Sequence, residues 1–196
     1  MTYKFTSGAK NAIEYANEAS LKLGHEYIGT EHILYGLARE KTSIASKVLE
    51  GQNVTPDAIY TQIEDIIGPG KLKSRKVLGF TPRTKKILEN ASNEAKKLNS
   101  DFIGTEHILI GILKEGDSVA VRVLINLNID IKVIYEDILK VISENISEEN
   151  KIKNKSDKKE TNISNTPTLN QFGIDLTKRA KDRKAGSNNW KKRRNR

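Results

Sequence analysis

The sequence contains no cysteine, few aromatic residues and no long apolar run. Without cysteine there is no disulfide, thiolate zinc ligand or thiol nucleophile, and we expect a reducing, cytoplasmic compartment. No run approaches the ~20 apolar residues of a membrane-spanning helix, and no apolar signal segment follows Met1. Aromatic residues are only 6% of the chain, so its 36% hydrophobic content is mainly aliphatic, which favours packed helices over an aromatic-rich β-sandwich.

The net charge of +9 comes from one end of the chain. Residues 1–142 carry 19 Lys or Arg against 18 acidic residues, and residues 143–177 carry 5 against 6. Residues 178–196 carry 10 against 1. The basic character that would indicate a nucleic-acid partner is therefore confined to a tail.

An internal repeat organises the chain. The seven residues from Ile28 to Leu34 (IGTEHIL) recur unchanged from Ile103 to Leu109, an offset of 75. The same offset, without gaps, relates other pairs: Phe5-Thr6 to Phe80-Thr81, Leu23 to Leu98, Gly36 to Gly111, Val48-Leu49 to Val123-Leu124, and Tyr60 to Tyr135. The chain therefore contains two copies of one module.

Each copy is expected to contain four helices. Thr6 and Thr81 are predicted N-caps of the first helix, and second helices begin at Thr30 and Thr105. Short third helices are expected over 43–50 and 118–126, and fourth helices from near Thr55 and Asp130. Because no segment shows sustained period-two alternation, we predict an all-α fold of two four-helix repeats packed about a pseudo-twofold axis.

The segments outside the repeats are polar. We divide the chain into a first repeat (1–67), a mobile connector (68–79), a second repeat (80–142), a disordered, solvated linker (143–166) and a C-terminal segment (167–196). The linker is assigned because its composition offers almost no large apolar groups to bury.

The usual signatures of catalysis are missing. His25, His32 and His107 form no metal-binding motif in sequence, so we expect the two at helix starts to bond nearby backbone, and we expect no metal. The segment Gly68-Pro69-Gly70-Lys71 lacks the spacing of a phosphate loop. No catalytic triad or nucleophile elbow is present. We expect neither an enzyme nor a cofactor.

Two duplicated features remain as candidate binding groups. Thr6 and Thr81 lie at predicted helix N-termini, which favour anions such as phosphate. Glu31 and Glu106 lie in the first turn of another helix, where a carboxylate is stable and can accept a guanidinium. By itself this pattern is more typical of ordinary helix caps and first-turn acids than of a binding site.

At these residues the sequence resembles the duplicated N-terminal domain of Clp-type AAA+ unfoldases, closest to the ClpC branch. The resemblance covers 5–142 and continues at 166–177, which looks like the opening of that family's first ATPase module. It implies an all-α module that docks adaptor proteins and protein substrates for an ATP-driven unfoldase, with Clp unfoldase hexamers as further candidate partners. It also implies phosphoarginine binding, in which Glu31 and Glu106 hold the guanidinium while Thr6 and Thr81 hold the phosphate.

The 196 residues contain no Walker A loop, so the chain is expected to be truncated before the ATPase module and to have no ATPase site of its own. A one-base shift in a back-translation of 184–196 gives a sequence resembling the family's continuation. The basic tail is therefore interpreted as an out-of-frame segment, which sequencing the gene would test.

Two alternatives stay open. In one, residues 178–196 bind nucleic acid or another polyanion through Trp190 and the basic run from Lys191 to Arg194. In the other, the chain is a stand-alone regulator that competes with a full-length unfoldase for adaptors.

Overall fold

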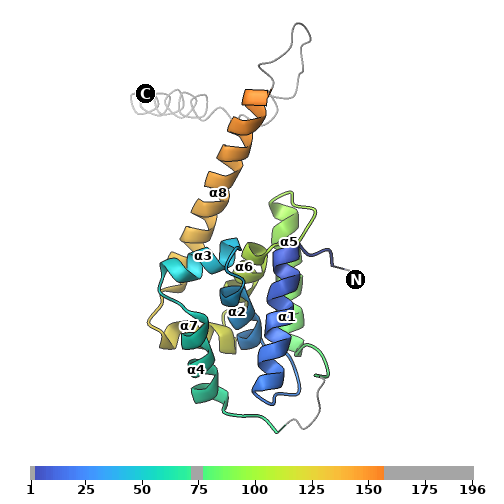
Figure 1. The fold of residues 1–196 in the computed structure, drawn as a ribbon, viewed down its shortest axis with the longest axis vertical. Helices are drawn as coiled ribbons and strands as arrows, with labels where there is room; N and C mark the ends of the chain where they lie inside the picture. Colours follow the sequence, from blue (N-terminus) through green and yellow to red (C-terminus); the bar gives the residue numbers. More distant parts are fainter. Residues whose placement is uncertain (1–2, 72–76, 157–196) are drawn as a thin grey trace, which may run out of the picture. The chain divides into compact units, whose positions relative to one another are not determined.

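Eight α-helices make up the part of the chain that the structure describes, which is residues 3–71 and 77–156 of a computed structural model. They are α1 (Ser7–Lys22), α2 (Thr30–Arg39), α3 (Ile44–Gly51), α4 (Pro56–Ile67), α5 (Pro82–Lys97), α6 (Thr105–Glu115), α7 (Val119–Asn126) and α8 (Ile131–Ser156) (Figure 1). Within those residues the only β pairing is two isolated bridges, Phe5 with Ile103 and Ile28 with Phe80. The predicted all-α fold of two four-helix repeats is confirmed. None of these helices is long and apolar enough to cross a bilayer.

The helices begin where the capping residues place them. The Thr6 hydroxyl accepts a hydrogen bond from the Ala9 N–H at 3.2 Å, and the Thr81 hydroxyl accepts one from the Thr84 N–H at 3.1 Å. Thr55 caps α4 in the same way. Each bond satisfies a donor that the first turn of a helix leaves without an intrahelical partner, and losing one typically costs about 1 kcal/mol.

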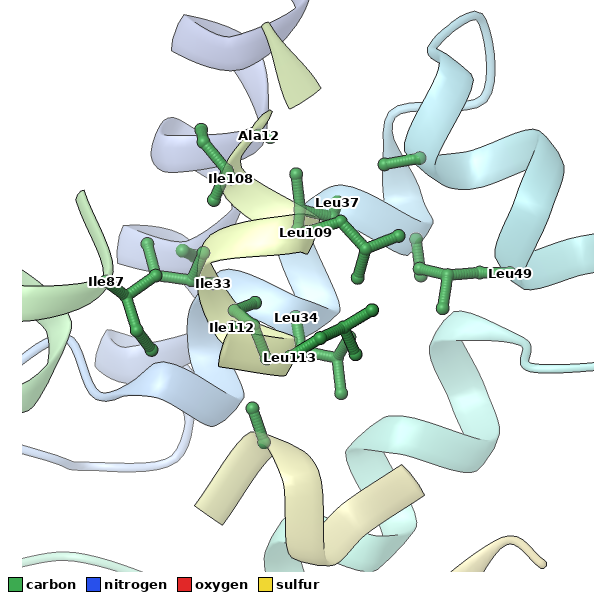
Figure 2. Packing of buried hydrophobic residues seen from close by; sticks show 14 of the residues in the cluster. Ala12, Ile33, Leu34, Leu37, Leu49, Ile87, Ile108, Leu109, Ile112 and Leu113 are labelled. Atoms are coloured by element: carbon green, nitrogen blue, oxygen red, sulfur yellow. The ribbon is translucent and has the colours of Figure 1, made fainter. Parts of the chain in front are cut away.

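The two repeats share one hydrophobic core, at the centre of which lie α2 and α6. α1 packs mainly on α2, α5 packs mainly on α6, and α2 also contacts α6. Apolar side chains of α2 and α6 face one another in Figure 2. Seven large ones in these two helices are fully buried: Ile33, Leu34, Leu37, Ile108, Leu109, Ile110 and Ile112. Burying each such side chain contributes roughly 1.5–3 kcal/mol. Residues Met1–Ile152 accordingly form one compact unit.

Glycine allows the first two helices of each repeat to approach closely. A Cβ at Gly36 of α2 would collide with the Ala12 carbonyl oxygen of α1. At the equivalent Gly111 of α6, a Cβ would lie 2.6 Å from the Ile87 carbonyl oxygen of α5. The repeated glycine is therefore a packing requirement of both copies.

The second repeat does not end at residue 142, because α8 continues to Ser156. The expectation of a disordered linker from residue 143 was wrong over residues 143–156. That expectation considered apolar content alone, whereas the segment is rich in Glu and Lys, which favour helix without a packing face. The remainder of the linker and the segment 167–196, with its basic tail, lie outside the described residues.

The connector between the repeats is hydrogen-bonded to the first repeat at both of its described ends. The Gly70 N–H donates to the Leu23 carbonyl oxygen at 2.7 Å, and the Leu78 N–H donates to the Glu26 carbonyl oxygen at 2.8 Å. Both acceptors lie at or beyond the end of α1, before α2. Sequence composition could not reveal these bonds, because their acceptors are backbone groups of another segment.

Candidate functional site

The Gly-Thr-Glu-His motif builds the N-terminus of α2 and of α6. The N-cap glycines have no side chain to cap the helix. Instead, His32 Nδ1 accepts from the Gly29 N–H at 2.8 Å, and His107 Nδ1 accepts from the Gly104 N–H at 2.9 Å. The predicted backbone-bonding role of these two histidines is confirmed.

The glutamate of the motif folds back over the helix end. A Cβ at Gly29 would collide with the carboxylate of Glu31, and one at Gly104 would collide with that of Glu106. Both carboxylates therefore require glycine at the N-cap. The Glu31 side chain is 8% exposed and that of Glu106 is 16% exposed.

Glu31 is a buried carboxylate that forms no ion pair with a lysine or arginine among residues 3–71 and 77–156, and its closest titratable neighbour is His32, whose Nδ1 lies 3.2 Å from Oε1. It accepts a weak hydrogen bond from the Thr30 hydroxyl at 3.3 Å. Burial raises the pKa of Glu31 above its ordinary value, and hydrogen bonds from its own N–H and from Thr30 offset only part of that effect. Such a carboxylate is placed to receive a cationic ligand, because a charge partner would offset its desolvation.

Three helix N-termini meet at Glu31. The Thr81 N–H, at the start of α5, donates to the Ile28 carbonyl oxygen at 3.1 Å. The Ala120 N–H, in the first turn of α7, donates to the Thr30 hydroxyl at 3.2 Å. We call Thr30, Glu31, Thr81 and the first turn of α7 the Glu31 site. Its three positive helix ends favour an anion beside the carboxylate.

The pseudo-twofold equivalent is built in the same way around α6. The Thr6 N–H donates to the Ile103 carbonyl oxygen at 3.0 Å, and the Ala45 N–H of α3 approaches the Thr105 hydroxyl at 3.5 Å. We call Thr6, Thr105, Glu106 and the first turn of α3 the Glu106 site.

These contacts group the four predicted site residues across the repeats. Thr81 is bonded to Ile28, three residues before Glu31, and Thr6 is bonded to Ile103, three residues before Glu106, so each glutamate is accompanied by the threonine of the other repeat. The offset of 75 showed that the two copies are equivalent, but it did not show that each site combines a threonine from one repeat with a glutamate from the other.

One cluster was missed from sequence. His25 Nδ1 lies 2.9 Å from His32 Nε2, and His25 Nε2 lies 2.9 Å from the Gly68 carbonyl oxygen. With His32 Nδ1 accepting from Gly29, both rings are neutral: His32 donates to His25, and His25 donates to Gly68. Burial and the neighbouring His25 lower the pKa of His32 to about 3. We call the hydrogen-bonded chain from His32 through His25 to the Gly68 carbonyl oxygen the histidine relay. Ser100 replaces His25 in the second repeat, so the relay exists only in the first.

The relay also explains how a metal-like grouping arises. Ligand atoms of His25, Glu31 and His32 lie within 4.8 Å of one another, contrary to the expectation that no second ligand approaches these histidines. However, His25 faces Nε2 of His32, whereas Glu31 Oε1 lies 3.2 Å from Nδ1 on the same ring. The three lone pairs do not converge on one point, so the arrangement is a hydrogen-bond chain.

Known proteins resemble this chain both in sequence and in fold. The family model "Clp repeat (R) N-terminal domain" matches residues 4–127 and 80–185. The chain is 40% identical over 180 residues to the ATP-dependent Clp protease ATP-binding subunit ClpC of Staphylococcus epidermidis. It is 38% identical over 179 residues to the negative regulator of genetic competence ClpC/MecB of Bacillus subtilis. Each match covers 91% of this chain and 21% of the relative, so the chain spans about a fifth of these relatives' length.

Solved structures share the architecture. The N-terminal domain of the chaperone ClpD from Arabidopsis thaliana superposes with a TM-score of 0.62 at 25% identity, covering 71% of this chain and 97% of that one. The N-domain of ClpV from Vibrio cholerae gives 0.58 at 17% identity, covering 71% and 86%. A ClpV N-domain in complex with a VipB peptide gives 0.52 at 18% identity, covering 68% and 88%. The chain belongs to the family of Clp repeat N-terminal domains and is of the ClpC type.

Proposed function

We propose that this chain is a cytoplasmic docking module of a Clp chaperone–protease system, binding adaptor proteins and protein substrates. Substrates marked by phosphoarginine bind at the Glu31 and Glu106 sites. The module performs no catalysis and needs no cofactor. The observation that carries the proposal is the buried Glu31 carboxylate, which pairs with no lysine or arginine of the described residues, at a junction of three helix N-termini.

The chemistry of this junction matches both halves of a phosphorylated guanidinium. The carboxylate receives the planar N–H groups of the guanidinium, which pair well with carboxylates. The positive ends of α5 and α7 attract the phosphoryl oxygens. An unmodified lysine or a free phosphate satisfies only one half of the arrangement.

Exposed aromatic side chains beside the two sites suit protein docking. Tyr27 and its repeat equivalent Phe102 are 45% and 50% exposed, immediately before Ile28 and Ile103. Aromatic residues of this kind are enriched where proteins bind one another. A relative of the same fold, the ClpV N-domain, forms a complex with a VipB peptide.

Calorimetry with free phosphoarginine tests the proposal. We expect Glu31→Ala combined with Glu106→Ala to abolish binding while the helical circular dichroism stays unchanged. The matched control combines Glu14→Ala with Glu89→Ala, a repeat-equivalent pair of exposed glutamates on α1 and α5. Loss of both site carboxylates without any loss of affinity would refute the assignment.

A further inference from the structure

The two sites differ at two charged positions, because Arg83 and Asp117 at the Glu31 site correspond to Gly8 and Thr42 at the Glu106 site. Arg83 in the first turn of α5 corresponds to Gly8 in the first turn of α1 under the offset of 75. α5 contributes to the Glu31 site and α1 to the Glu106 site, because the pairing crosses between repeats. One site therefore has a neighbouring arginine that the other lacks.

Arg83 lies between two of the helix N-termini that form the Glu31 site. Its Nη1 is 3.4 Å from Asp117 Oδ2, just before Ser118, the N-cap of α7. The side chains of Arg83 and Asp117 are 44% and 93% exposed. An ion pair so exposed is weak, so the guanidinium is available to an incoming anion.

The Glu106 site has room for a side chain at Gly8 and a second buried carboxylate instead. Around Gly8, the nearest neighbours of an added Cβ would be Thr105 Cγ2 at 3.8 Å and Glu40 Cγ at 3.9 Å. Glu40 is 7% exposed and accepts a hydrogen bond from the Thr42 hydroxyl at 2.7 Å. Within residues 3–71 and 77–156 no cation forms an ion pair with it, and its repeat equivalent Glu115 is less buried.

We propose that the two sites differ in preference: the Glu31 site binds the phosphorylated guanidinium more tightly, whereas the Glu106 site binds it more weakly and prefers the unmodified guanidinium of an arginine side chain. Position 83 and its equivalent, position 8, determine the difference. A phosphoryl group carrying up to two negative charges gains an attraction from Arg83. At the Glu106 site the equivalent position is Gly8, so the phosphoryl group meets Glu40 and Glu106 without the arginine of the other site, whereas a bare guanidinium is attracted by both carboxylates.

The preference of the Glu31 site for phosphoarginine rests on the proposed function, whereas the preference of the Glu106 site for arginine does not. Variants that keep only one of the two sites test these preferences separately. Glu106→Ala leaves the Glu31 site, and Glu31→Ala leaves the Glu106 site. By calorimetry with phosphoarginine and with N-acetylarginine amide, we expect Glu106→Ala to bind phosphoarginine at least tenfold more tightly than Glu31→Ala does. The order should reverse for N-acetylarginine amide. The same ranking of both proteins for both probes overturns the inference.

Placing an arginine at position 8 tests whether this position determines the difference between the two sites. In the Glu31→Ala background, Gly8→Arg should raise phosphoarginine affinity about tenfold and weaken N-acetylarginine amide binding. Gly51→Arg is the matched control: it adds the same charge to the same repeat at an open position, and should change either affinity less than twofold. Equal effects of the two substitutions overturn the role of position 8.

The arginine half has its own test. Glu40→Gln in the Glu31→Ala background should weaken N-acetylarginine amide binding about tenfold. If neither single-site protein binds phosphoarginine, the proposed function fails. Arginine binding that Glu40→Gln removes then still supports the assignment of the Glu106 site, and absence of arginine binding overturns it.

Discussion

The backbone N–H of Thr81 donates a hydrogen bond to the Ile28 carbonyl oxygen at 3.1 Å, which places the first cap of the second repeat at the start of α2 in the first. The reciprocal bond joins Thr6 to Ile103 at 3.0 Å. Each site is therefore shared between the repeats, and neither repeat by itself contains a complete one.

If each site is shared between the repeats, ligand binding at the Glu31 site should depend on Thr81 and not on Thr6. In the Glu106→Ala background, Thr81→Ala should weaken phosphoarginine binding about five- to tenfold, because one bond to a charged group is lost. Thr6→Ala should leave that affinity unchanged. Thr81→Ser, which keeps the hydroxyl, serves as the control for the Thr81 cap. The opposite ranking in calorimetry would indicate pairing within a repeat.

Glu31→Gln should stabilise the folded chain and abolish ligand binding at the Glu31 site. Burial raises the pKa of Glu31, so its ionised form weakens the folded state at neutral pH. Removing the charge should raise the free energy of unfolding at pH 7 by about 0.5–2 kcal/mol and abolish phosphoarginine binding at this site. The gain should shrink as the pH falls through the raised pKa of Glu31 and disappear below the ordinary carboxyl pKa, where this group is protonated in both the folded and the unfolded chain. Urea unfolding at pH 7 and pH 4 measures both effects, with exposed Glu14→Gln as the control.

The histidine relay predicts loss of stability in mild acid. The pKa of His32 is lowered from 6.5 to about 3 in the folded chain. Between these two pH values His32 is therefore protonated in the unfolded chain but neutral in the folded chain. Stability is complete above pH 6.5 and is lost progressively as the pH falls towards 3. Between pH 7 and pH 5 this histidine alone should cost about 2 kcal/mol in the free energy of unfolding. An NMR titration showing His32 protonated near pH 6.5 would contradict the relay.

Glycine at the close helix crossing predicts a ranked stability series. Gly36→Ala should cost about 1–3 kcal/mol, because its Cβ would collide with the Ala12 carbonyl oxygen and force α1 and α2 apart. Gly111→Ala should cost less, since its Cβ would find the Ile87 oxygen at 2.6 Å. Gly51→Ala, in a helix with nothing within 4 Å, should be neutral or stabilising. Thermal unfolding of the three variants measures the order.

Local chemistry explains which structural predictions succeeded. Thr6, Thr81 and Thr55 start helices because a side-chain oxygen satisfies an orphan N–H within three residues, and such short-range bonds are visible in sequence. α8 extends past residue 142 because helix propensity continued where apolar content did not. The anchoring of Gly70 on Leu23 and of His25 on Gly68 involves backbone carbonyls distant in sequence, which carry no residue-type signal.

The order of residues by itself determined the duplication, the capped helices, and the four side chains from which the candidate sites are built. Only the tertiary structure decided that Thr81 accompanies Glu31 and Thr6 accompanies Glu106, that His25 reaches His32, and that Glu40 lies beside Gly8. The physical reason is that helix caps and periodic apolar faces depend on neighbours a few residues away. The composition of each site depends instead on how two equivalent bundles bury their shared core, and that packing exchanges their helix ends.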